Sequence, residues 1–122
     1  MSFRALSIAT AAICFALAAV WMFAPRLLLD VWGVLPGDNE AIGLTGRRMA
    51  ALFAGFGVMF YRARNAEPSI ARAALSSGIV AACLALAALG LYELASGRAG
   101  VGILSAAAVE AALALGFLTA RC

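Results

Sequence analysis

Three runs of twenty residues dominate the hydrophobic pattern of the chain: residues 5–24, 73–92 and 101–120. The first two contain no charged residue, and the third contains only Glu110. At a rise of about 1.5 Å per residue, a helix of about 20 residues crosses the roughly 30 Å hydrocarbon core of a bilayer. The pattern therefore predicts three membrane-spanning helices.

A fourth span is predicted between the first two runs. The uncharged stretch over residues 49–61 has thirteen residues, which is too short to cross a bilayer. Extending it back to residue 41 gives an adequate length and brings Arg47 and Arg48 into the helix. These arginines then either extend outward to the membrane surface or meet acidic groups inside the protein.

We therefore predict an all-α fold: an integral membrane four-helix bundle that forms a single domain over residues 1–122. The expected spans lie at about residues 5–24, 41–62, 70–94 and 100–120. The connection after the first span is long and carries Trp32. Residues 26–34 are expected either to form a short helix along the membrane interface or to be an irregular hydrophobic loop packed on the helix ends.

Composition and charge agree with a membrane protein. The chain is 66% hydrophobic, has 12% charged residues and a mean hydropathy of +1.03, which leaves too little polar surface for a soluble domain. With four spans, one side holds five arginines and a single acid, Glu67, whereas the other holds four arginines and four acids. The positive-inside rule then places both termini in the cytoplasm of a cell with an inner membrane, although the modest bias leaves dual topology open. The five arginines are Arg4, Arg62, Arg64, Arg72 and Arg121.

The chain lacks the residues that most common catalytic and metal sites require. There is no histidine, and the three cysteines form no CxxC pair, so we expect no metal site and no cofactor. No serine has the histidine and aspartate partners that nucleophilic catalysis needs. The net charge of +3 is too small and scattered to indicate nucleic-acid binding. A non-enzymatic role is favoured, and an enzyme acting on lipids or quinones is a minor alternative.

Four ionisable residues are the candidates for a buried polar cluster: Glu110, Arg47, Arg48 and Glu93. Glu110 falls near the bilayer midplane, where a carboxylate costs at least about 2.5 kcal/mol unless it is paired or functional. The topology puts Arg47, Arg48 and Glu93 in the same half of the membrane. Three alternatives follow. Arg48 or Arg47 pairs with Glu93 and Glu110 to fix the helix register, Glu110 titrates or contacts a ligand, or Glu110 is protonated and merely tolerated in the apolar helix.

The order of motifs is similar to that of the DoxX-like group of small four-helix membrane proteins. The first span ends in Pro25 and is followed by a tryptophan-bearing loop up to Gly33. The arginine-started second helix (GRRMAALFAGFGVMFY) and a glutamate in the fourth (AVEAALA) complete the resemblance. It implies a membrane helical bundle with an accessory role beside quinone-linked oxidoreductases, although no residue here carries redox chemistry.

Two functions follow as hypotheses. The first is an accessory subunit of a larger membrane complex or a module that binds a lipophilic small molecule. The second is an oligomeric transporter or proton-coupled channel with Glu110 at its coupling site. The expected partners are the lipid bilayer, a larger membrane complex or further copies of this chain, and a lipophilic small molecule; nucleic acid is not expected.

Overall fold

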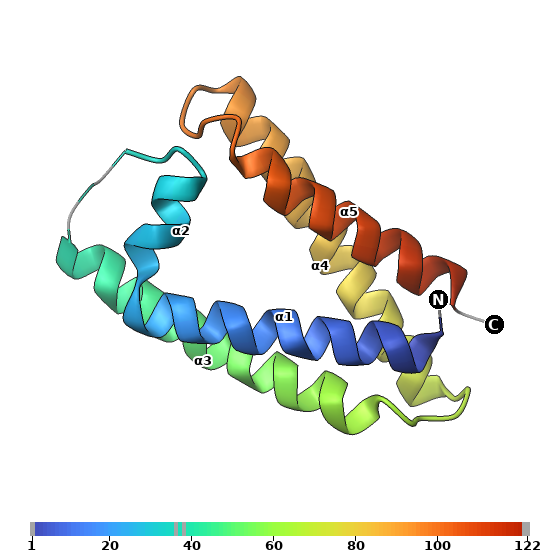
Figure 1. Ribbon diagram of the computed structural model, residues 1–122. Helices are drawn as coiled ribbons and strands as arrows, with labels where there is room; N and C mark the ends of the chain where they lie inside the picture. Colours follow the sequence, from blue (N-terminus) through green and yellow to red (C-terminus); the bar gives the residue numbers. More distant parts are fainter. Residues whose placement is uncertain (1, 36, 38, 121–122) are drawn as a thin grey trace.

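The computed structural model of the chain describes residues 2–35, 37 and 39–120. These residues form five helices and no strand, so the all-α prediction is confirmed. Four helices cover the segments predicted as spans, and residues 25–31 form a short helix rather than an irregular loop. Figure 1 shows α1 (Phe3–Phe23), α2 (Pro25–Val31), α3 (Asn39–Ala63), α4 (Ile70–Ala95) and α5 (Ile103–Thr119).

Local sequence explains where several helices begin and end. The Ser2 hydroxyl accepts a hydrogen bond from the Ala5 amide (3.1 Å), and the Ser69 hydroxyl accepts one from the Arg72 amide (3.2 Å), so each serine caps a helix start. Pro25 forces Ala24 out of the helical conformation, which ends α1. The same proline fits the first position of α2, because an amide proton is not needed there.

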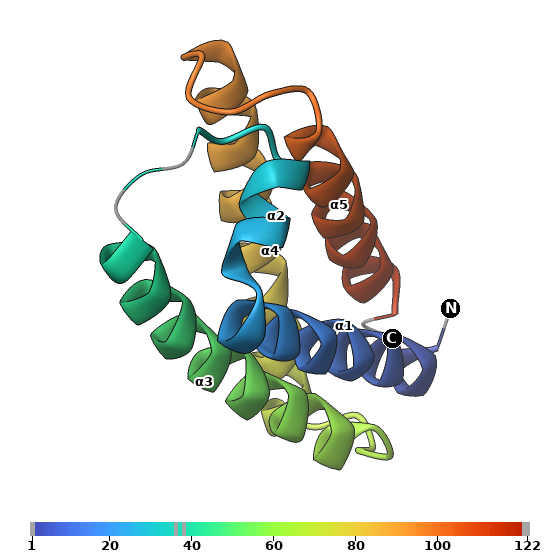
Figure 2. The ribbon, with the colours of Figure 1, turned by 60° about the vertical axis from the view of Figure 1, so that its left-hand side comes forward.

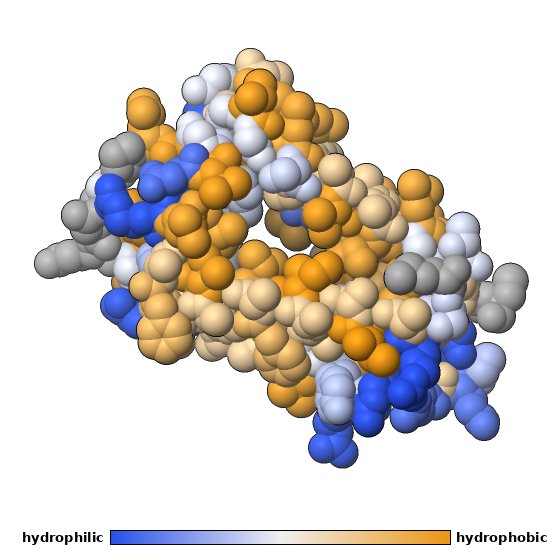
Figure 3. Space-filling view, viewed as in Figure 1, coloured by the Kyte–Doolittle hydropathy of each residue, from blue (hydrophilic) through white to orange (hydrophobic). Residues whose placement is uncertain are grey.

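The helices are arranged as two pairs. α1 packs along α3 and carries α2 at its end, whereas α4 packs along α5. The two pairs touch each other far less than the helices within a pair do. Figures 1 and 2 show that the α4–α5 pair diverges from the α1–α3 pair along its length. The space-filling view in Figure 3 shows an opening between the pairs, bordered mainly by hydrophobic residues, which we call the interhelical opening.

An aromatic core joins the pairs where α1 begins and α5 ends, which we call the terminal end. Phe117 of α5 is fully buried, and its ring centroid lies 6.0 Å from that of Phe3 on α1 and 5.7 Å from that of Phe60 on α3. Leu6 packs against Gly116, where an added Cβ would overlap the leucine side chain at 2.6 Å. Three helices therefore meet at this end through side chains.

The opposite end, where α2 meets the α4–α5 connection, is held by backbone contact; we call it the loop end. The Gly100 amide donates a 2.9 Å hydrogen bond to the Trp32 carbonyl. Gly33 adopts a positive φ of 69°, and a Cβ added to it would lie 2.8 Å from the Gly100 Cα. Gly102 sits so close to the Val31 carbonyl oxygen that an added Cβ would overlap it. Glycines are needed here because the two segments of the chain touch backbone to backbone.

Two helices, α1 and α4, are long and apolar enough to cross a membrane; α5 is a shorter apolar helix of 17 residues. Much of this apolar surface faces outward, as Figure 3 shows for one side of the molecule. The exposed large hydrophobic residues on α3, α4 and α5 include Leu52, Met59, Leu84, Leu89, Leu104 and Leu115. An apolar surface of this extent is typical of proteins that meet lipid or a partner.

Candidate functional site

Glu110 lies on the face of α5 that packs inward. It is half-buried and stands three residues after Ala107 and four before Ala114, both of which are buried. In the described part of the chain, its carboxylate forms no ion pair and no hydrogen bond. An apolar helix thus presents an unpartnered carboxyl group to the interior of the molecule, which is the arrangement expected of a ligand-contacting group.

Several further polar groups lie on the inward faces of the neighbouring helices. Cys83 of α4 and Cys14 of α1 are both buried. One and two turns closer to the start of α1, Thr10 and Ser7 are almost completely buried, at 1% and 0% exposure. Neither hydroxyl has a hydrogen-bond partner within residues 2–35, 37 and 39–120. Such groups are uncommon in folded proteins and carry a cost in stability.

Glu93 is paired locally, at the end of α4. Arg98 in the α4–α5 connection donates from Nε to Oε2 of Glu93 over 2.6 Å, with both side chains partly exposed. The hydrogen bond to Glu93, together with one to Tyr92, raises the pKa of Arg98 above its ordinary value, so this arginine stays charged. Glu93 therefore uses a neighbour in sequence instead of Arg47 or Arg48.

Arg47 and Arg48 are exposed on α3 and form no ion pair in the described part of the chain. The guanidinium of Arg47 lies back along its own helix, 3.2 Å from the position that a Cβ on Gly43 would take. Because α3 packs on α1 and barely touches α4 or α5, these arginines do not reach Glu110 or Glu93. The four residues predicted as a cluster thus lie in three separate places: Glu110 on α5, Glu93 at the end of α4, and the two arginines on α3.

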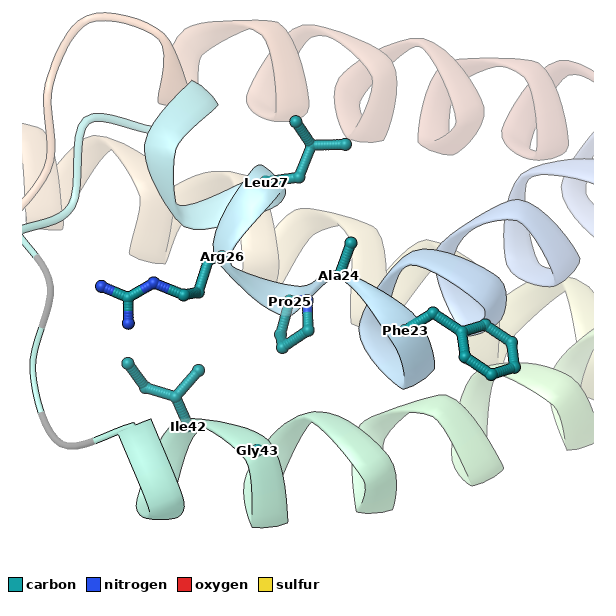
Figure 4. Close-up of a pocket in the computed structure, with 7 residues that line it drawn as sticks. All are labelled: Phe23, Ala24, Pro25, Arg26, Leu27, Ile42 and Gly43. Carbon is teal, nitrogen blue, oxygen red and sulfur yellow. The ribbon is translucent and has the colours of Figure 1, made fainter.

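A shallow pocket of about 220 Å³ lies between the α1–α2 bend and the first turns of α3. Figure 4 shows its lining: Phe23, Ala24, Pro25, Arg26, Leu27, Ile42 and Gly43. Leu27 and Phe23 point away from Ile42 in this view, whereas Arg26 extends toward the same side as Ile42. The pocket is open and mostly apolar, and it lacks a converging set of polar groups that would orient a ligand.

Sequence reasoning missed a second group of charges at the terminal end. Arg4, Arg64 and Arg72 line one pocket there, although the sequence analysis counted them only as indicators of membrane orientation. The available signal was topological: in a four-helix chain, the start of the first helix and the connection between the second and third lie at the same end. Arg121, the fifth arginine of that side, lies outside the described residues.

Comparison with protein-family models, with curated proteins and with solved structures gave no match. The resemblance to the DoxX-like group accordingly stays a prediction from the order of motifs. In the part of the chain that the structure describes, no group of three or more histidine, cysteine, aspartate or glutamate residues is placed to hold a metal ion.

Proposed function

We infer that the protein is a non-enzymatic integral membrane protein that binds a lipophilic molecule in the interhelical opening. The observation that carries this proposal is the unpartnered, half-buried carboxyl group of Glu110 on the inward face of an apolar helix. In the proposal, α1, α3, α4 and α5 cross the inner membrane with both chain termini on the cytoplasmic side.

The distribution of hydrophobic side chains supports the membrane location. Large residues such as Leu52 (57% exposed) and Leu115 (64% exposed) lie on the outside of helices whose inward faces hold serine, threonine, cysteine and glutamate. In water this arrangement would be unstable, because apolar surface gains about 25 cal/mol per Å² when it leaves water. In lipid the same surface is solvated by acyl chains, and the polar residues are shielded by the protein.

The polar interior supports a ligand with a polar group on an apolar body. The carboxyl group of Glu110 is partly exposed and has no partner among the described residues. A ligand hydroxyl group that donates to this carboxyl group would offset part of the cost of placing it in an apolar helix. The apolar borders of the interhelical opening, visible in Figure 3, suit the rest of a lipophilic molecule.

The test is native mass spectrometry of the protein extracted gently from the membrane in which it is expressed. We expect one small lipophilic molecule to be retained by the unaltered chain. Glu110→Leu, which removes every hydrogen-bonding atom of this side chain, should lower the retained fraction by about tenfold or more. The matched control is Glu93→Leu, which removes a carboxylate that pairs with Arg98 at the loop end and should leave retention unchanged.

Two results would count against this function. A stoichiometric second polypeptide, with no small molecule, would make the chain an accessory subunit and Glu110 a contact within that complex. Equal retention in Glu110→Leu and in the unaltered chain would show that the carboxyl group does not hold the ligand.

A further inference from the structure

The terminal end carries a pocket lined by three arginines that come from separate segments. Arg4 belongs to the first turn of α1, Arg64 to the connection after α3, and Arg72 to the first turn of α4. The pocket has a volume of about 310 Å³, and its remaining lining residues are Ser2, Phe3, Asn65 and Ala66. Figure 3 shows hydrophilic side chains gathered on the surface at this end, where α1 begins and α3 ends.

Arg72 is the fixed member of the group. Its guanidinium donates to the Ala66 carbonyl (3.2 Å) and to the Ala120 carbonyl (3.3 Å), and it lies over the Phe3 ring at 4.3 Å from the centroid. An arginine has five N–H donors, so these two bonds leave others available. Stacking on the ring and bonding to carbonyls hold the group in place while its positive charge stays unneutralised.

Arg64 and Arg4 are also held by neutral partners. Arg64 donates to the Tyr61 carbonyl (2.6 Å) and stacks over the Tyr61 ring at 3.9 Å. Arg4 donates to the side-chain oxygen of Asn65. Among the described residues, none of the three arginines forms an ion pair. Three positioned guanidinium groups that form no ion pair within the described residues can bind an anion, since planar arginine donors match the oxygens of a phosphate.

The surrounding backbone favours the same kind of ligand. α1 starts at this pocket with its cap residue Ser2, so the first free amides of a 21-residue helix add partial positive charge beside the arginines. In the orientation that the arginine distribution predicts, this end faces the cytoplasmic leaflet. Anionic lipids are concentrated there, and basic pockets at helix ends bind their head groups.

We propose that the pocket formed by Arg4, Arg64 and Arg72 binds the phosphate head group of an anionic phospholipid at the membrane surface. The site is separate from Glu110 and the interhelical opening, so it stands whether or not a lipophilic molecule binds there. The phosphate receives hydrogen bonds from the arginines, and the acyl chains lie against the apolar outer surface of the helices. Occupation of the site neutralises the mutual repulsion of the three guanidinium groups and strengthens the terminal end.

The experiment measures lipid binding to the full chain in detergent by native mass spectrometry, with dioctanoyl phosphatidylglycerol and dioctanoyl phosphatidylcholine as probes. We expect the anionic lipid to bind about tenfold more tightly than the zwitterionic one. The double variant Arg4→Gln/Arg64→Gln should lose this preference. Arg62→Gln, which removes one charge from an exposed arginine outside the pocket at the same end, should keep it within about twofold.

Three results would overturn the proposal. Equal affinity of the unaltered chain for both lipids would show that no head-group site exists. A loss in Arg62→Gln that equals, per removed charge, the loss in the double variant would show diffuse charge attraction instead of a pocket. Displacement of the anionic lipid by about 10 mM inorganic phosphate, with loss of the lipid preference, would assign the site to free phosphate.

A second measurement uses the unaltered chain and so does not depend on whether the variants fold. Phosphatidylglycerol with a photoreactive group on its head group is cross-linked to the protein in vesicles, and the modified peptides are identified. We expect cross-links in residues 2–4 and 64–72. Cross-links concentrated around residues 96–102 at the loop end would contradict the assignment.

Discussion

At the terminal end the two helical pairs are joined by interlocking side chains, whereas at the loop end they are joined by backbone. The terminal end buries Phe3, Leu6, Phe60 and Phe117, and Arg72 ties α4 to the end of α5. The loop end is held by a backbone hydrogen bond that Gly100 donates to Trp32 and by close-packed glycines. Between these ends lies the interhelical opening.

This difference shows how a small helical protein can keep an internal opening and still hold its shape. Apolar burial and dispersion in the aromatic core fix the angle between the pairs. At the loop end, a backbone contact without large side chains sets the distance between the pairs. Separating this contact costs less stability than separating the aromatic core. We expect the loop end to open and the terminal end to stay closed when a ligand enters.

The largest effect is expected for Phe117→Ala. Phe117 is 0% exposed and touches two other aromatic rings, so its truncation leaves a cavity at the junction of three helices. The free energy of unfolding in detergent micelles should fall by about 3–5 kcal/mol. Phe23→Ala, at a phenylalanine that is 85% exposed, is the matched control and should change it by less than about 0.5 kcal/mol. Similar losses in both variants would show that the terminal end is not the main support.

A smaller loss is expected for Arg72→Met, which keeps an unbranched side chain but removes the guanidinium group. Two carbonyls, those of Ala66 and Ala120, lose their hydrogen bonds, and the contact with the Phe3 ring is lost. Unfolding free energy should fall by about 2–3 kcal/mol, measured by thermal or denaturant unfolding in micelles. Arg62→Met removes an exposed charge at the same end and serves as the control. An unchanged free energy of unfolding in Arg72→Met would show that Arg72 does not stabilise the terminal end.

At the loop end, Gly102→Ala should separate the backbone contact. The new Cβ overlaps the Val31 carbonyl oxygen, and relief of that clash costs about 1–2 kcal/mol. Hydrogen exchange should accelerate at the Gly100 amide, which donates to Trp32, while exchange in the aromatic core stays slow. Gly78→Ala is the control, since nothing lies within 4 Å of its added Cβ. Faster exchange at both ends together would show that the two ends open as one unit.

An effect of opposite sign, from none to a gain in stability, is expected for Glu110→Leu. Because Glu110 has no partner in the described part of the chain, its replacement removes a carboxyl group without breaking a bond. Stability should stay the same or rise, by up to about 2.5 kcal/mol, in unfolding experiments on ligand-free protein. A marked loss of stability would show that Glu110 has a structural partner, and the proposed ligand role would fall.

The sequence was informative where a local rule applies. Three twenty-residue apolar runs and one extended thirteen-residue stretch predicted four helices, and each is covered by a helix whose ends lie within a few residues of the prediction. Pro25 marked the end of α1, and the alternative of a short helix after it corresponds to α2. These features depend on neighbours along the chain, because hydrogen bonds within a helix and the proline ring act over four residues or fewer.

The candidate site was less predictable, because pairing between charges depends on how helices face one another. Arg98 is five residues from Glu93 and forms the ion pair that the sequence analysis expected from Arg47 or Arg48. Arg72 was counted as an orientation signal, yet it connects α4 to the end of α5, 48 residues away in the chain. Neither relation follows from hydrophobic spacing alone.

By itself, the sequence determined that this chain is helical, where its helices lie, and that a single carboxyl group is placed within the most apolar region of α5. Those properties follow from composition and periodicity, which act within one helix at a time. Only the tertiary structure decided that α1 pairs with α3 and α4 with α5, that Glu110 has no partner among the described residues, and that Arg4, Arg64 and Arg72 share a pocket. The physical reason is that contact between helices depends on the packing of whole surfaces, to which residues far apart in the chain contribute together.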